Sequence, residues 1–251
     1  MNQARFFVEF SYHGAPFHGW QRQPNAPSVQ EVMESAFELL LKTPCPITAA
    51  GRTDTGVHAR YMVAHFDAPI KLIDLEELPF RVNQILPKEI AIQSIKGVKP
   101  DAHARFDALF RTYEYHIATI KTPFNNDFVH TLYQSIDLDL MNQAASLLLS
   151  YSDFECFSKS NTDVKTYLCK LTYAQWSKTE NGYVFTITAN RFLRNMVRAI
   201  VGTLLEIGLH KKKLDDLDVI IKSKNRSLAG YSVPAKGLFL TQIQYPETLY
   251  I

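Results

Sequence analysis

The sequence has few cysteines and no long apolar run. Cys45, Cys156 and Cys169 are far apart and belong to no CxxC pattern. This argues against a disulfide framework or a structural zinc site and favours buried, reduced thiols. No apolar stretch approaches the ~20 residues needed to cross a bilayer, and the first residues lack the apolar stretch of a signal peptide. We therefore expect a cytoplasmic protein without a membrane partner.

Net charge is also nearly absent. There are 27 Lys and Arg residues against 25 Asp and Glu, for a net charge of +2, so the chain as a whole is not a basic module. A local basic patch lies between residues 189 and 213, where six Lys or Arg residues accompany one acid, Glu206. The patch is compatible with a solvated helix face followed by a lysine-rich turn, and also with a surface that contacts phosphates.

Hydrophobic residues make up 46% of the chain and follow the periods of both helices and strands. Predicted helices begin at a Ser28–Glu31 capping box, at an Asp139 N-cap and at Phe192. The last of them runs to Ile207 with Gly208 as its stop, and Asn181-Gly182 predicts a hairpin. On the helix predicted from Phe192, Arg194 and Arg198 fall opposite the apolar face. The order of elements predicts an α+β fold of two subdomains, 1–105 and 106–251, with a mainly antiparallel sheet.

One stretch, AAGRTDTGVHARY over residues 49–61, concentrates polar chemistry. Asp54-Thr55-Gly56 is the tripeptide of aspartic proteases. That chemistry needs two carboxylates sharing a proton, whereas Arg52 nearby favours a fully ionised Asp54. A turn capped by Asp54 is the plain structural interpretation. A simple turn does not need three ionisable side chains as close in sequence as Arg52, Asp54 and His58. The stretch therefore also predicts an ionised carboxylate that acts as a nucleophile or stabilises a cation.

Aromatic residues interleave with basic and amide side chains in two further places. Trp20 lies within FHGWQRQ beside Arg22, and Tyr113 and Tyr115 share one face of a predicted strand. Exposed rings in such surroundings stack on RNA bases, although most aromatic residues at these spacings belong to a core. The isolated histidines have no ligand-like companions, so no metal site is expected.

Five motifs together resemble the TruA family of tRNA pseudouridine synthases. They stand in the family's order and span nearly the whole chain: YHGAPFHGWQRQ (12–23), GRTDTGVHA (51–59), HARFDALFRTYEYHI (103–117), RFLRNMVRAIVGTLLEIG (191–208) and PAKGLFLTQIQYP (234–246). The resemblance implies two related α+β halves that share a mainly antiparallel sheet. It places helices on one face and the active cleft between the halves, and makes a homodimer the working unit.

The resemblance also implies an activity. Members of the family convert uridine to pseudouridine in the anticodon stem-loop of tRNA, usually at positions 38, 39 and 40, without a metal or organic cofactor. The N1–C1′ bond breaks, the uracil turns, and C5 joins C1′. A carboxylate can stabilise the electron-deficient sugar, add to C1′ or take the 2′ proton, and the sequence does not choose among these.

Site residues follow by matching motifs. Asp54 falls on the family's essential aspartate, Arg52 on the arginine of the same motif, and Tyr113 on the active-site tyrosine, which stacks on the turned base and takes the C5 proton. Arg198 is expected to be the basic residue that faces Asp54, with Arg194, one helical turn earlier, as the other candidate. RNA contacts are expected from Tyr113, His58, Arg22, Arg194, Lys211 and Lys212.

Two departures from the family pattern bear on these expectations. Thr55 stands where Ala is usual, and Tyr231-Ser232-Val233 replaces a more typical Pro-Thr-Ala. Neither is expected to touch the chemical groups. The second departure motivates a competing hypothesis, a non-catalytic tRNA-binding or tRNA-folding protein on the same scaffold. A dimeric aspartic protease is the third hypothesis.

Overall fold

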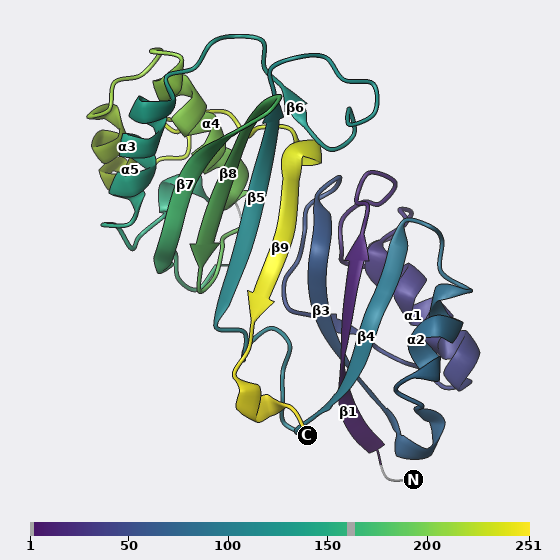
Figure 1. The fold of residues 1–251 in the computed structure, drawn as a ribbon. Helices are drawn as coiled ribbons and strands as arrows, with labels where there is room; N and C mark the ends of the chain where they lie inside the picture. Colours follow the sequence, from purple (N-terminus) through teal and green to yellow (C-terminus); the bar gives the residue numbers. More distant parts are fainter. Residues whose placement is uncertain (1–2, 160–163) are drawn as a thin grey trace. The chain divides into compact units, whose positions relative to one another are not determined.

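The computed structural model describes residues 3–159 and 164–251, which form two compact units. The first unit comprises the chain up to Phe110 together with Phe239–Ile251, and the second comprises Arg111–Leu238. The described residues contain five α-helices and strands in both antiparallel and parallel pairs, which confirms the α+β class (Figure 1). The division at residues 105/106 and the relation between two halves stay predictions. No helix in the described ranges is long and apolar enough to span a bilayer.

The first unit is built on a sheet whose central strand is β1 (Gln3–Tyr12). β1 pairs antiparallel with β3 (His58–Pro69) on one side and with β4 (Ile90–Val98) on the other. The short β2 (Thr48–Ala49) pairs antiparallel with β3. β9 (Leu238–Gln244) pairs with the start of β3 in parallel, with His58 opposite Phe239. This sheet is therefore mainly, but not wholly, antiparallel.

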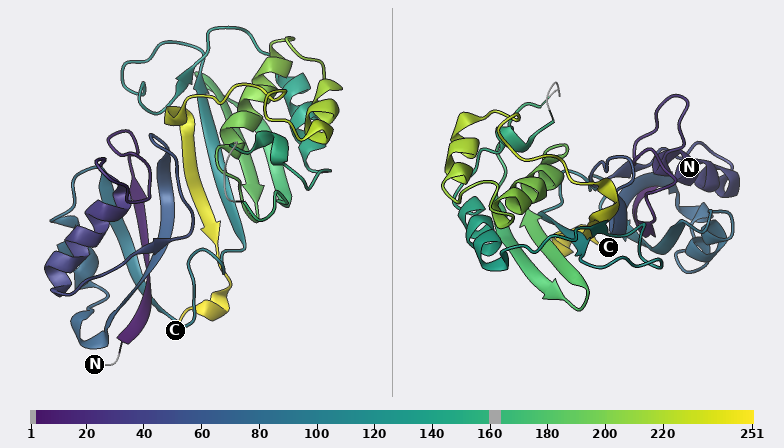
Figure 2. Two further views of the ribbon diagram at one scale, coloured as in Figure 1. Left: turned by 180° about the vertical axis from the view of Figure 1, so that it is seen from behind. Right: turned by 90° about the horizontal axis from the view of Figure 1, so that it is seen from above.

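Two helices cover one face of this sheet (Figures 1 and 2). α1 (Val29–Leu41) begins at the predicted cap, where the Ser28 hydroxyl accepts a hydrogen bond from the Glu31 amide at 3.3 Å. Phe37 of α1 packs edge-on against Phe66 of β3, with ring centroids 4.9 Å apart. α2 (Glu77–Asn83) contacts α1 and β4. Burying each such large side chain contributes about 1.5–3 kcal/mol to folding.

The end of the chain returns to the first unit. Phe7 of β1, fully buried, lies against Tyr245 and Tyr250, with ring centroids 5.0 and 6.2 Å away. The Ile251 amide donates to the Gly97 carbonyl of β4. These contacts cover β1 and β4 with the last residues of the chain, which are far from both strands in sequence. The four 3₁₀ segments in the described residues are η1 (Ile70–Leu72), η2 (Glu155–Phe157), η3 (Ala235–Gly237) and η4 (Glu247–Leu249).

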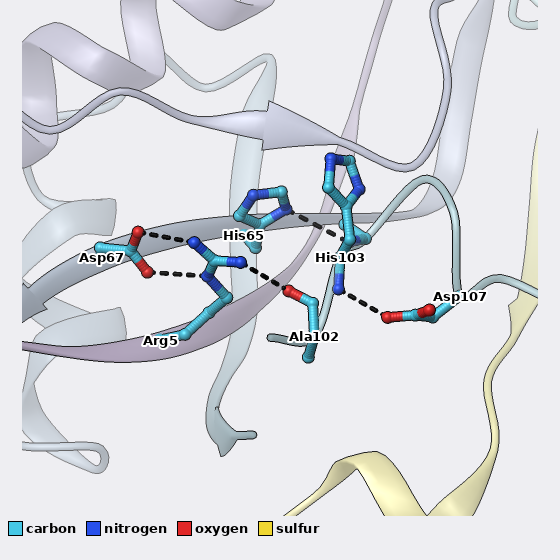
Figure 3. A network of polar contacts seen from close by, with 7 residues as sticks. Arg5, His65, Asp67, Ala102, His103 and Asp107 are labelled. Carbon is cyan, nitrogen blue, oxygen red and sulfur yellow. Dashed lines mark hydrogen bonds and ion pairs between the residues drawn. The ribbon is translucent and has the colours of Figure 1, made fainter. Parts of the chain in front are cut away.

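A polar network ties the segment after β4, the 102–107 loop, to β1 and β3 (Figure 3). Arg5 donates two hydrogen bonds of 2.8 Å to the Asp67 carboxylate and one of 3.0 Å to the Ala102 carbonyl. The Ala104 amide donates to Nδ1 of His65 at 3.2 Å. That bond requires an unprotonated Nδ1, so the loop depends on His65 remaining neutral.

Acidification is expected to weaken the first unit through His65. Burial, followed by the charges of His103 and Arg5, lowers the pKa of His65 to about 4, against the opposing effect of Asp67 and Asp107. At a pH between about 4 and the ordinary pKa near 6.5, His65 is protonated in the unfolded chain but not in the folded chain. The free energy of unfolding should therefore fall as the pH drops from about 6.5 to about 4 and change little from this source below that.

Urea unfolding at several pH values between 7 and 4 measures this dependence. His65→Asn should flatten it, because an amide oxygen can still accept the Ala104 bond but does not titrate. His18→Asn, which replaces an exposed histidine of the same unit, is the matched control. An unchanged pH slope in His65→Asn would contradict the assignment.

The sheet of the second unit is formed by β5 (Phe110–Ala118), β7 (Leu171–Thr179) and β8 (Gly182–Ala189). β8 pairs antiparallel with β5 and with β7, and the short β6 (His130–Thr131) pairs in parallel with β5. Thr179 stands opposite Gly182 where β7 turns into β8. The hairpin predicted from Asn181-Gly182 is thus confirmed.

The helices of the second unit start at residues that differ from the predicted ones. α3 (Leu138–Leu148) is capped by Asp137, whose carboxylate accepts from the Leu140 amide at 2.9 Å, so the Asp139 cap was wrong. α4 (Met196–Gly208) begins four residues after Phe192, because Asn195 adopts a left-handed conformation with φ of 66°. α5 (Asp216–Ser223) follows, and α3 packs against both β7 and α4 (Figure 2).

All three cysteines are free and buried, as predicted. Burial raises the pKa of Cys45 and Cys156 to about 12 and that of Cys169 to about 11. The thiols are therefore protonated near neutral pH and unreactive.

Candidate active site

Asp54 lies in the loop between β2 and β3 of the first unit. The Ala50 amide donates to the Val63 carbonyl at 2.8 Å where the loop leaves β2, and the Val57 amide donates to the Asp54 carbonyl at 3.1 Å where it turns into β3. The Asp54 side chain is half-buried. These backbone bonds thus hold the loop so that Asp54 lies four residues before the start of β3.

The N-terminal motif forms a cradle for this loop. The Trp20 amide donates to the Thr53 carbonyl at 3.2 Å, and the hydroxyls of Tyr12 and Thr53 are 2.8 Å apart. Gly19 has a φ of 87°, and a Cβ at this position would lie 2.5 Å from the Thr53 carbonyl oxygen. A Cβ on Gly14 would lie 2.0 Å from the carbonyl oxygen of Val57. Both glycines are required because the two backbones touch on either side of Asp54.

This relation between the two motifs was not predicted, although the sequence contains a signal for it. Two glycines within YHGAPFHGWQ indicate close backbone approach as well as a flexible loop. The motifs at 12–23 and 51–59 are one structure, and the first serves to position the second.

His58 has a structural place that differs from the predicted RNA contact. It is 1% exposed, and its Nδ1 accepts a hydrogen bond of 3.0 Å from the Gly14 amide. Its ring stacks on His13 and on Phe239, with centroid distances of 5.0 and 4.7 Å. A side chain enclosed in this way fixes the start of β3, and an RNA contact by His58 stays a prediction.

Arg52 is exposed, and in the described parts of the chain no ion pair joins it to Asp54. The sequence predicts that Arg52 is a partner that keeps Asp54 ionised. The geometry instead directs Arg52 to solvent from the loop that holds Asp54, because Thr53 between them is buried and bonded to Tyr12. A cation in that position is suited to contact a phosphate of a bound nucleic acid.

Arg22 is half-exposed and pairs with Glu34 of α1, with Nη2 3.2 Å from Oε2. Glu34 is buried and also accepts hydrogen bonds from the Gln30 side chain and the Ile47 amide, each at 3.0 Å. Arg22 therefore compensates a buried carboxylate that ties α1 to β2. Its predicted RNA contact would have to use the exposed part of the guanidinium.

Tyr113 lies in β5 of the second unit, opposite Ile187 of β8. It is half-buried, and its ring packs edge-on against Phe192 at a centroid distance of 5.1 Å. Tyr115, on the same face, is fully buried, and its hydroxyl donates to the Pro234 carbonyl at 2.8 Å. Burial raises the pKa of Tyr115 well above its ordinary value. Of the two tyrosines, only Tyr113 is accessible to a ligand.

Arg198 and Arg194 occupy different structural settings. Arg198, in the first turn of α4, is half-buried and donates from Nε to the Val233 carbonyl at 2.7 Å, while the Val233 amide donates back to the Arg198 carbonyl at 3.3 Å. Arg194 is exposed and precedes the helix. The predicted basic stripe along one helix is therefore wrong, because α4 begins after Arg194 and is buried almost all round.

The altered residues 231–233 are part of this setting. Val233 is fully buried against Arg198, and the Ser232 hydroxyl accepts hydrogen bonds from Asn195 at 2.7 Å and from Arg226 at 2.9 Å. The expectation that these departures do not touch the chemical groups is corrected. Residues 231–233 hold the first turn of α4, and with it the backbone and Nε of Arg198.

The backbone of α4 contacts the backbone of residues 231–233 so closely that adding one methyl group at Gly202 should destabilise the protein. A Cβ on Gly202 would lie 1.8 Å from the Tyr231 carbonyl oxygen. Overpacking against backbone costs about 3 kcal/mol and helix propensity returns about 1 kcal/mol, so Gly202→Ala should lower the free energy of unfolding by about 2 kcal/mol. Urea denaturation measures it. Gly51→Ala, with no atom within 4 Å of the added Cβ, is the control; equal midpoints for both variants would refute the prediction.

Lys211 and Lys212 lie beyond the opposite end of α4. Lys211 is exposed, and Lys212 approaches Glu206 with Nζ 3.6 Å from Oε2. A helix of 13 residues is about 20 Å long, so these lysines are remote from Arg198. They cannot belong to the same cluster as Arg194 and Arg198, although all are close in sequence.

The predicted site residues thus fall into groups by unit. Arg22, Arg52, Asp54 and His58 belong to the first unit, and Tyr113, Arg194, Arg198, Lys211 and Lys212 belong to the second. In the described part of the chain, no three His, Cys, Asp or Glu side chains are grouped as metal ligands. The first unit contributes a half-buried carboxylate, the second an accessible phenol, and both contribute cations.

Comparisons with known proteins agree in assigning a family. A family model described as tRNA pseudouridine synthase matches residues 10–107 and 144–246. The proteins named tRNA pseudouridine synthase A from Bacteroides fragilis and Parabacteroides distasonis are 47% and 49% identical to this chain. The alignments cover 100% of both chains in the first case and 98% of both in the second. The protein of that name from Bacillus pumilus is 36% identical, with 94% of this chain and 96% of its own length aligned.

Proposed function

The chain belongs to the tRNA pseudouridine synthase family, and we propose that it isomerises uridine to pseudouridine in tRNA. The observation that carries the proposal is the Asp54 loop. Asp54 is half-buried just before the start of β3, and the backbone on both sides of it is in close contact with glycines of the N-terminal motif. A loop whose backbone is held so closely is suited to present one carboxylate to a single atom of a bound ribose.

We propose that Asp54 is the nucleophile. The glycosidic N1–C1′ bond breaks with its electron pair leaving on uracil, and the carboxylate adds to C1′, which is electron-deficient as in glycoside hydrolysis. The uracil stays bound, turns, and displaces the carboxylate through C5. Loss of the C5 proton then completes pseudouridine. A single carboxylate suffices because uracil leaves as a stabilised anion and needs no acid to protonate it.

Tyr113 and Arg198 complete the proposed chemistry from the second unit. Tyr113, accessible and supported by Phe192, stacks on the turned base and receives the C5 proton directly or through water. Arg198, whose Nε is held by the Val233 carbonyl, supplies the positive charge that faces the carboxylate. The proposal requires that Asp54, Tyr113 and Arg198 act on the same uridine.

The substrate is proposed to be the anticodon stem-loop, with positions 38, 39 and 40 as targets, and the working unit a cytoplasmic homodimer. A uridine in a stem or loop must leave its stack to reach a pocket, at a cost of a few kcal/mol. Arg52 and Arg194, which are both exposed, are proposed to offset this cost by contacting phosphates beside the displaced nucleotide.

The proposal is tested with tRNA that carries tritium at C5 of uridine. Wild-type protein should release tritium to water, and mapping of the product should place pseudouridine at positions 38–40. Tight tRNA binding without tritium release would instead support a non-catalytic tRNA-binding protein. Release with pseudouridine at other positions would keep the reaction and overturn the site assignment.

A further inference from the structure

The 102–107 loop carries a solvent-facing phenylalanine fixed between an imidazole and a guanidinium. Phe106 is 73% exposed. Its ring centroid lies 4.3 Å from that of His103, and Cζ of Arg105 lies 5.6 Å from the ring centroid. The cation and the imidazole leave most of the ring surface open to solvent while restricting its orientation.

Hydrogen bonds within the 102–107 loop and to other segments hold the backbone next to Phe106. Within the loop, the His103 amide donates to the Asp107 carboxylate at 2.7 Å, and the Asp107 amide donates to the His103 carbonyl at 3.0 Å (Figure 3). Ala104 is held from outside the loop, since its amide donates to His65 and its carbonyl accepts from the Tyr245 hydroxyl. A ring on so rigid a support loses little conformational entropy when it binds a ligand.

Exposure alone does not distinguish Phe106 from other exposed aromatic residues. Phe80 of α2 is 65% exposed, and in the described residues it has no ring or cation contact. Single exposed apolar side chains are common on protein surfaces. Phe106 differs because the fold holds the backbone on both sides of it and because the Arg105 guanidinium contacts its ring.

We propose that Phe106 is a stacking platform for an unpaired nucleobase of the bound tRNA, with Arg105 directed to the adjacent phosphate; the inference rests on the proposed function. Every nucleobase has a face that stacks on an aromatic ring, and a flanking arginine adds attraction to the backbone. Ala104 is attached to His65, seven residues along β3 from His58 at the end of the Asp54 loop, which is about 23 Å at 3.3 Å per residue. The platform therefore binds a nucleotide other than the one isomerised.

The surroundings favour RNA over a second copy of the chain. Arg105 contacts the ring, and two further exposed charged residues, Lys99 and Asp101, lie within seven positions of Phe106 in the sequence. Charged side chains are depleted from the dry centre of protein–protein interfaces, whereas they suit contact with a nucleotide, which has an apolar face and a charged backbone.

The test compares Phe106→Leu with Phe80→Leu, which removes a similarly exposed ring from the same unit. Phe106→Leu should raise Kd for tRNA, and KM in the tritium-release assay, about tenfold, with kcat unchanged. Phe80→Leu should change none of these. Arg105→Gln should lower the slope of log Kd against log salt by about one, as expected for one lost phosphate contact.

Wild-type tRNA affinity in Phe106→Leu would overturn the inference. A fall in molecular mass by light scattering in Phe106→Leu would also overturn it, by identifying a second copy of the chain as the occupant. If wild-type protein releases no tritium, the proposed reaction fails, but the difference in Kd between the two variants still decides whether the platform exists.

Discussion

Asp54→Asn is expected to reduce turnover at least ~10³-fold while leaving the fold and tRNA affinity intact. The amide has the size of the carboxylate but can neither add to C1′ nor stabilise a positive sugar. Binding should not weaken, because the substitution removes a negative charge from a site that accepts a polyanion. Single-turnover tritium release and tRNA binding measure the two effects separately.

Asp139→Asn removes the same charge at an exposed position in the first turn of α3 and serves as the matched control. It should be as active as the wild type. Undiminished tritium release from Asp54→Asn would remove the central residue from the mechanism. A loss of tRNA binding and turnover together would show that Asp54 positions the substrate.

Tyr113→Phe should lower kcat by ~10²–10³-fold with KM changed by no more than about twofold, since positioned proton transfer is worth 10²–10⁴-fold. The substitution removes only the hydroxyl and keeps the ring packed against Phe192, so stacking on the base persists. Uridine deuterated at C5 should show a larger isotope effect on turnover by the variant, because loss of the C5 proton becomes slower.

Tyr133→Phe, which removes a hydroxyl from a tyrosine that is 68% exposed in the same unit, is the control. A normal kcat in Tyr113→Phe would restrict Tyr113 to stacking. A raised KM with normal kcat would assign it to binding the ground state.

Local signals in the sequence were sufficient for much of the fold. The capping box at Ser28 starts α1, and the Asn181-Gly182 turn joins β7 to β8. These features depend on residues within a few positions of one another, whose conformational preferences act in the same way in any context. Two helix starts were wrong, at Asp139 and Phe192, where the actual start depends on which side chain reaches the free amides and on a left-handed Asn195.

In the candidate site, too, nearby residues in the sequence predicted some features and tertiary contacts decided others. The motif around Asp54 identified the loop, its carboxylate and its family from one short run of residues. Tertiary contacts decided that His58 is enclosed, that Arg52 turns to solvent and that the glycines of the N-terminal motif cradle the loop. They also decided that Arg198 is held by Val233.

The sequence by itself therefore determined the fold class and the family, because both rest on residue types at short, fixed spacings. Only the tertiary structure decided which polar side chains are available for chemistry. His58 meets Gly14 across 44 residues and Arg198 meets Val233 across 35. Whether a side chain is enclosed or exposed depends on such distant partners, and hydrophobic periodicity contains no information about them.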